Sequence, residues 1–469
     1  MILSLQAFAP AALLLGGGLL LLLRPSATIY VVVQALTLAA LLRLSQIATA
    51  AVTVPLYDPL ADAPLILRLD RLSIFFATSG VLAALLVSLP WIGDHRPLPF
   101  GWLALAQFGS VCAITAGNLQ GLAAGWGMAV AALLMLVVMP RPLARELRRP
   151  SRSATRNLVL QLAGAVLVLT GAVAVEATAG TTSYDAVPTG ALDSRTGLLL
   201  VAGPVVALAT TAGLARLCRG AGSAALMLTG VTLPMAVYVL ARTFDLAGGH
   251  PLGATPANGL ALSAGMGAAL FAVSALWAPD LGATIGRGLN ALALTLVAAF
   301  ALGGATGLAA LVLGFISLEA VAAASLVMLD AGHGRLPGRG RLPRWALGGG
   351  ALLPLVALGG VVVGLALDAR MLLLRRVVEM GLPGIALGTP LGVAALGLLA
   401  AALAAARFGG GRVESRRGSL QVAMATAVLL ATGLWAPVLR DLAVAIAAAS
   451  ARVPVAEVRS SVLGALPGV

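Results

Sequence analysis

The chain has 469 residues, of which 60% are hydrophobic and only 10% are charged, and its mean hydropathy is +1.02. Soluble globular proteins carry roughly 25% charged residues, so this composition excludes that class. The net charge of +13 comes from arginines in short loops between apolar runs, a pattern typical of membrane topology and not of nucleic-acid binding.

Apolar stretches long enough to cross a bilayer recur along the whole sequence. A spanning helix needs about 20 apolar residues, and this measure predicts about 14 transmembrane helices. The first is expected to stay as a helix because it lacks the basic segment of a signal peptide. The spans are expected near residues 2–23, 26–43, 72–92, 101–117, 119–140, 157–177, 197–215, 222–241, 258–278, 288–303, 305–329, 345–367, 384–406 and 419–438. The predicted fold is therefore all-α: a polytopic helical bundle over residues 1–440 and an interfacial C-terminal tail at 441–469.

Loop charge predicts the orientation of the bundle. Arginine-rich connections at 141–156, 335–344 and 407–417 follow odd-numbered spans, whereas acidic connections follow even-numbered ones. By the positive-inside rule the odd-numbered loops face the cytoplasm, so both termini are expected outside a bacterial inner (cell) membrane. Residues 368–379 break the alternation and are expected to form a broken or re-entrant piece.

The helix at residues 223–242, SAALMLTGVTLPMAVYVLAR, carries Pro234 near its centre. Proline removes a backbone donor and pushes on the preceding turn, which predicts a kink or break. In lipid, a carbonyl freed in this way must be satisfied by protein or by a watery cavity. We therefore expect this helix to lie inside the bundle.

Few ionisable groups fall within the predicted spans, and each is a functional hypothesis by default. Glu319, near the middle of the eleventh span, is either a carboxyl that hydrogen-bonds between helices or a proton-carrying site. Asn290 and Gln161 are polar side chains that could extend a proton path. Asp70, flanked by Arg68 and Arg71, fits a surface ion pair or a charge at a helix N-terminus.

The sequence contains no pattern of an active site. It has no Gly-rich phosphate loop, nucleophile elbow or metal-ligand cluster, so we predict no catalytic, cofactor-binding or metal-binding residue in this chain and no cofactor. His95, His250 and His333 fall in loops and are assigned no role. All thirty basic residues are arginine, which keeps its proton, so a pump built on lysine carriers is excluded.

Three stretches, in order, resemble one family. They are LRLDRLSIFF at residues 67–76, the helix at 223–242, and PLVALGGVVVGLALDARMLLLRRVVEMG at 354–381. Together they resemble the antiporter-like membrane subunits of proton-pumping NADH:quinone oxidoreductase, of Mrp-type cation/proton antiporters, and of membrane-bound hydrogenase and formate hydrogenlyase complexes. The resemblance implies two inverted repeats with broken helices. It implies other membrane subunits as partners, and peripheral redox subunits where the complex is redox-driven.

The chain departs from this family at the positions that carry protons. The family's Glu in the fifth span falls on Gly127, its broken-helix Lys falls on Pro234, and its His falls near Thr210. No proton-channel residue carries over. The matched positions are Asp70, Tyr238 and Arg242, which the resemblance implies are architectural.

Three functions remain open on the sequence. The first is a membrane subunit of a multisubunit redox-driven or ion-translocating complex, with a degenerate proton path and a mainly structural or assembly role. The second is a subunit that conducts protons or sodium through Glu319, Asn290, Gln161 and water. The third is an independent secondary transporter, disfavoured because so little polar surface is available to bind a substrate. If the chain belongs to an oxidoreductase complex, it is a non-catalytic subunit.

Overall fold

The chain folds into two compact units in the computed structural model. Unit 1 comprises Met1–Ala207 and Ser223–Leu246, and unit 2 comprises Leu208–Gly222 and Ala247–Val469. The structure describes residues 2–47, 51–57, 65–92, 99–138, 152–188, 192–210, 223–249, 252–279, 281–333, 364–380, 382–405, 426–429 and 434–463.

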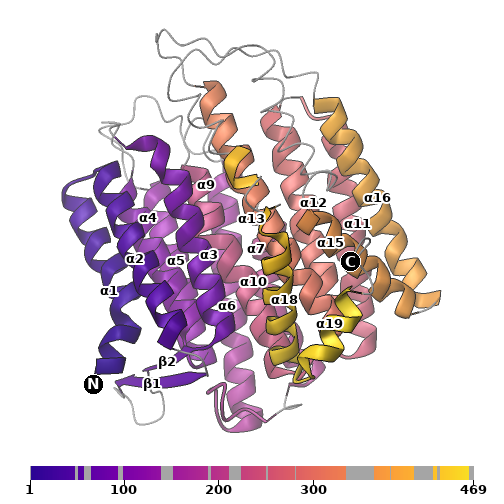
Figure 1. Cartoon of the computed structure of the whole chain (residues 1–469), viewed down its shortest axis with the longest axis horizontal. Coiled ribbons are helices and arrows are strands. Elements are labelled where there is room, and N and C mark those ends of the chain that lie inside the picture. Colours follow the sequence, from indigo (N-terminus) through magenta and orange to yellow (C-terminus); the bar gives the residue numbers. More distant parts are fainter. Residues whose placement is uncertain are drawn as a thin grey trace. The chain divides into compact units, whose positions relative to one another are not determined.

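Helices dominate both units (Figure 1). The elements of unit 1 are α1 (Ile2–Leu23), α2 (Ala27–Ile47), β1 (Val52–Tyr57), β2 (Leu65–Leu69), α3 (Arg71–Ser88), η1 (Leu89–Trp91), α4 (Phe100–Thr115), α5 (Leu119–Val138), α6 (Arg152–Ala179), α7 (Ser194–Ala209, whose end passes into unit 2), α9 (Ser223–Met227), η2 (Leu228–Thr232) and α10 (Leu233–Leu246). Those of unit 2 are α11 (Ala254–Leu276), α12 (Leu281–Leu302), α13 (Gly304–His333), α15 (Gly364–Glu379), α16 (Leu382–Ala405), α18 (Ala436–Ala451) and α19 (Val455–Leu463).

The predicted polytopic membrane fold is confirmed. Within the described residues, eight helices are long and apolar enough to cross a membrane, and four shorter apolar helices accompany them. Each expected span up to residue 329 overlaps a helix. The expected spans at 345–367 and 419–438 lie mostly outside the described residues, as do most of the arginine-rich connections. Residues 368–379, expected to be broken or re-entrant, belong to the continuous helix α15, which packs against α13.

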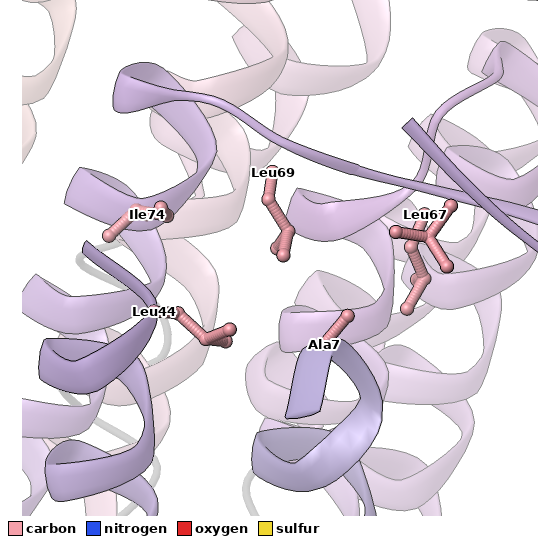
Figure 2. Packing of buried hydrophobic residues seen from close by; sticks show 6 residues of the cluster. Ala7, Leu44, Leu67, Leu69 and Ile74 are labelled. Atoms are coloured by element: carbon pink, nitrogen blue, oxygen red, sulfur yellow. The ribbon is translucent and has the colours of Figure 1, made fainter. Parts of the chain in front are cut away.

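The structure also contains a small antiparallel sheet, which the all-α prediction did not include. Strands β1 and β2 pair with Val52 opposite Leu69 and Val54 opposite Leu67, and the hairpin lies near the N-terminal end of α1 (Figure 1). Leu67 and Leu69 turn toward the helices, where they join Ala7 of α1, Leu44 of α2 and Ile74 of α3 in one buried cluster (Figure 2). The hairpin therefore closes the apolar core of unit 1 at this end.

Helices α4 and α5 cross at a very short separation. A Cβ atom on Gly109 would meet the backbone N and Cα of Ala129, and one on Gly125 would meet the backbone of Ala113, at distances under the 3.0 Å that real Cβ atoms essentially never show. Without side chains at these two positions, the helix backbones can approach directly, as small residues allow in membrane bundles.

Unit 2 is built on alanine-rich helix contacts. Helices α11, α12 and α16 share a buried cluster of Ala268, Ala272, Ala291, Leu294, Ala394 and Leu398. Helix α13 packs against α12, α15 and α18. The boundary expected at residue 441 falls inside α18, which buries Ala443, Val444 and Ala447; α19 follows it along the chain. Most of the expected tail is thus helical where the structure describes it.

Candidate functional site

The irregular helix α9–η2–α10 packs against α3 and α4 in unit 1. An apolar stretch of 18 residues within Ala225–Leu246 is completely buried. The centre of the helix is the π-helical turn η2, which immediately precedes Leu233 and Pro234. The amide of Leu233 bonds to the carbonyl of Leu228, five residues back, one residue more than in an α-helix. Pro234 has no amide proton to donate, and the irregular turn lies directly before Leu233 and this proline.

Arg242 lies in the C-terminal part of α10 and is only 1% exposed. Its Nη2 atom donates to Asp70 Oδ2 at 2.7 Å, and its Nη1 atom donates to Asp245 Oδ2 at 2.8 Å. Nε and Nη2 both donate to the hydroxyl of Tyr238, at 3.1 and 3.0 Å. One guanidinium therefore binds two carboxylates and a phenol, a use that suits its planar fork of donors.

Asp70 holds its position because it is also the N-cap of α3. Its Oδ1 atom accepts from the Ser73 amide at 2.8 Å, and the Ser73 hydroxyl accepts from the Asp70 amide at 2.9 Å, which completes a capping box. Arg68, on β2, donates to Asp70 Oδ2 at 3.0 Å. The same arginine forms an ion pair with Asp185 at 2.7 Å, so the hairpin and the connection between α6 and α7 meet here.

Tyr184 covers the cluster from that connection. The Arg242 guanidinium lies 4.9 Å from the centroid of the Tyr184 ring and 5.3 Å from that of Tyr238, within the range of cation–π attraction. The backbone amide of Tyr184 donates to the carbonyl of Gly117 at 3.1 Å. The three residues proposed from the sequence as architectural, Asp70, Tyr238 and Arg242, thus share one hydrogen-bonded cluster.

The electrostatics of this cluster keep it charged. Burial raises the pKa of Asp70, but the Arg242 guanidinium, the hydrogen bond from the Ser73 amide and the Arg68 guanidinium outweigh burial and bring that pKa below its usual value. Burial raises the pKa of Tyr184 well above its usual value. Asp70 is therefore ionised and Tyr184 neutral at neutral pH, so neither exchanges a proton there.

This pKa direction predicts how stability depends on pH. A carboxyl with a depressed folded-state pKa stabilises the fold above its unfolded-state pKa, about 3.9 for Asp, and loses that contribution as pH falls through the folded-state value. We expect D70N to melt below wild type at pH 5–7, and the two melting temperatures to converge as pH falls below about 4. Thermal melts in detergent across this pH range measure the difference. D441N, at an exposed aspartate, should follow wild type throughout; a D70N deficit independent of pH would contradict the assignment.

A second buried polar cluster lies beside η2. It was not predicted from the sequence. Tyr30 and Gln34 of α2 both donate to the side-chain oxygen of Gln107 on α4, the tyrosine at 2.8 Å. On α4, Ser110 Oγ lies 3.4 Å from the carbonyl oxygen of Val231 in η2. The spacing of Tyr30 and Gln34, one helical turn apart, was the only available signal that they share a face.

The residues of the expected proton path are divided between the units. Asn290 lies on α12 and Glu319 on α13, two helices of unit 2 that pack together, and both are buried. The Asn290 amide donates to the carbonyl of Ala209 at 3.2 Å. Gln161 is buried on α6 of unit 1, where its two amide atoms have no partner among the described residues.

Unit 2 contains a buried ion pair as well. Asp368 of α15 is 3% exposed, and both of its oxygens accept from Arg440 of α18, Oδ1 from Nη2 at 3.0 Å and Oδ2 from Nε. Among the residues that the structure describes, the buried charged side chains are Arg242, Glu319 and Asp368. Two of these three are therefore fixed in ion pairs.

Comparison with known proteins finds similarity in structure. No protein-family model and no curated protein sequence matches the chain. A chain of the Mrp complex from Dietzia sp. DQ12-45-1b superposes with a TM-score of 0.79 and 18% identity over 99% of this chain. A chain of respiratory complex I from Thermus thermophilus superposes with a TM-score of 0.74 and 19% identity over 95% of this chain. A chain of the membrane-bound sulfane sulfur reductase, an archaeal respiratory membrane complex, superposes with a TM-score of 0.69 and 16% identity over 92% of this chain.

The matched lengths differ among these structures. This chain covers 55% of the Mrp chain, 99% of the complex I chain and 76% of the reductase chain. At these low identities the likeness establishes the fold. The fold expected from the resemblance to antiporter-like subunits is thereby confirmed, and the chain is a multi-pass membrane protein of that architecture.

Proposed function

We propose that this chain is a membrane subunit of a multisubunit ion-translocating or redox-driven complex, of the NADH:quinone oxidoreductase, hydrogenase or Mrp type, and that its role is mainly structural. The mainly structural role is supported by the ion pairing of the buried charged side chains. Arg242 and Asp368 are held in ion pairs, and such pairs favour a fixed arrangement over proton exchange.

The positions that would carry protons by resemblance support the same proposal. A relay through hydrocarbon needs titratable groups or water at short intervals. Gly127 and Pro234 stand at two such positions, and neither side chain titrates. Pro234 instead packs against α3, where a Cβ atom on Gly80 would lie 2.9 Å from its Cγ. This part of the helix serves packing in place of proton transfer.

The proposed partners and location follow from the same resemblance. Other membrane subunits would flank the chain in a bacterial inner membrane, and peripheral redox subunits would join where the complex is redox-driven. In this proposal the odd-numbered connections face the cytoplasm and both termini lie outside, which the loop arginines support through the positive-inside rule. The partners of related chains are proposed here for this one because their fold is shared.

Isolation of the native assembly tests the proposal. The chain, tagged in its own genome and extracted in mild detergent, should migrate on a native gel with several other membrane proteins, which mass spectrometry would identify. A chain that migrates alone from gently solubilised membranes, and that takes up a labelled solute after reconstitution, would establish the independent transporter instead.

A proton path through Glu319 is the second candidate, favoured by its burial on α13 next to the helix that bears Asn290. Under the structural proposal, vesicles containing the complex with E319Q should show the proton flux of wild type. A tenfold or greater loss of flux with assembly intact would establish the conducting role. E457Q, at an exposed glutamate of α19, is the matched control for the loss of one carboxylate in unit 2.

A further inference from the structure

The Gln34–Gln107 pair in unit 1 has more hydrogen-bonding capacity than its neighbours satisfy. Both side chains are at most 1% exposed. Gln107 Oε1 accepts from Tyr30 and from Gln34, yet Gln34 Oε1 and Gln107 Nε2 have no partner among the described residues. One amide acceptor and one amide donor are thus left over in the interior of a membrane bundle.

Turning the amides does not remove this surplus. If both amide groups are rotated by 180°, Gln107 donates to Tyr30 and Gln34, and the leftover atoms become Gln107 Oε1 and Gln34 Nε2. Either assignment leaves one donor and one acceptor on the same two side chains. Because buried amides without partners are strongly disfavoured, the pair requires a third hydrogen-bonding group.

The position of Gln107 shows where that group would bind. A Cβ atom on Gly230 would lie only 3.0 Å from Gln107 Nε2, so the unpaired donor faces the backbone of η2. The neighbouring Thr232 hydroxyl of η2 is also buried without a partner among the described residues. In a π-helical turn the regular hydrogen bonding of the backbone is disturbed. The unpaired amide of Gln107 therefore faces polar groups of η2.

We propose that Gln34 and Gln107 bind water between α2, α4 and η2, and so form an uncharged hydrated site beside the irregular helix. The chemistry selects water because Tyr30 and the two glutamines are neutral at physiological pH and supply both donors and acceptors. An ion would lack a compensating charge on these three side chains. Water can donate to the leftover oxygen and accept from the leftover amide, which is the role of ordered internal water in proteins.

Hydroxyl-radical footprinting by X-ray pulses tests this site, because a buried side chain reacts quickly only when water lies next to it. Tyr30 in the intact wild-type protein should be modified at least tenfold faster than Phe76, which is equally buried in α3 of the same unit. Modification of Tyr30 at the rate of Phe76 would overturn the proposal. This readout is independent of partners and of ion flux, so it stands apart from the proposed function.

Substitutions then assign the water to the amides. Q107L and Q34L should each lower Tyr30 modification to the rate of Phe76, and two variants are used so that one that fails to fold does not end the test. T37V removes a buried hydroxyl one turn from Gln34, and this hydroxyl donates to the carbonyl of Val33 in its own helix; the substitution should leave Tyr30 modification unchanged. Rapid Tyr30 modification that persists in folded Q107L and Q34L would show that water binds elsewhere.

Discussion

Replacement of Arg242 by methionine is expected to lower the free energy of unfolding by about 3–5 kcal/mol, the usual cost of breaking a buried ion pair by removing one partner. Methionine fills much of the same volume but leaves Asp70 and Asp245 without the guanidinium that now lies 2.7 and 2.8 Å away. Tyr238 loses both of its hydrogen bonds from that side chain. Thermal unfolding in detergent and the yield of folded protein in membranes would measure the loss.

Two further variants show whether geometry or charge is responsible. R242K keeps the charge but replaces a planar fork with a compact ammonium, which cannot reach Asp70, Asp245 and Tyr238 from the same positions, so we expect an intermediate loss. R195M, at an exposed arginine near the start of α7, should melt like wild type. If R242M melts like R195M, the cluster does not hold unit 1 together.

The substitution G109A is expected to destabilise unit 1 by about 1–3 kcal/mol or more, the range for overpacking in a close-packed interior. The new methyl group would meet the backbone N and Cα of Ala129 on α5, and a backbone cannot move aside by changing a rotamer. The two helices must separate, so their remaining contacts are weakened as well. The melting temperature of the purified variant measures this loss.

Gly127 provides a matched control on α5. A Cβ atom there has no heavy atom within 4 Å, so G127A should be neutral or should stabilise the helix by up to about 1 kcal/mol, because alanine restricts the unfolded chain. G109A is therefore expected to destabilise the protein, whereas G127A is not. Equal effects of both variants would mean that helix propensity, and not the close crossing, controls stability here.

Much of the architecture could be predicted from local sequence. Runs of apolar residues gave the helices, and Pro234 marked the position of the π-helical turn. The strands were missed because a measure of 20-residue apolarity does not detect a five- or six-residue segment. The short alternations Val52-Thr53-Val54 and Leu67-Arg68-Leu69 are the period-two signal that could have revealed them.

The candidate site was only partly accessible to the same reasoning. Asp70 and Arg242 were each selected, but as separate motif positions, and their ion pair joins residues 172 positions apart. Gln34 and Gln107 were missed because they lie 73 positions apart on different helices, so no local pattern brings them together. Glu319, Asn290 and Gln161 remain a proposed path, with the last residue in the other unit.

The sequence by itself determined that the chain is a membrane protein. It also determined the positions of the helices along the chain and the small number of charged groups that the chain can bury. Only the tertiary structure decided which face of each helix is internal, and hence which polar groups meet. On α6, Val168 is fully buried while Val166, of the same residue type, is 55% exposed. Lipid tails are as apolar as a protein core, so hydrophobicity cannot distinguish the two faces, and packing must.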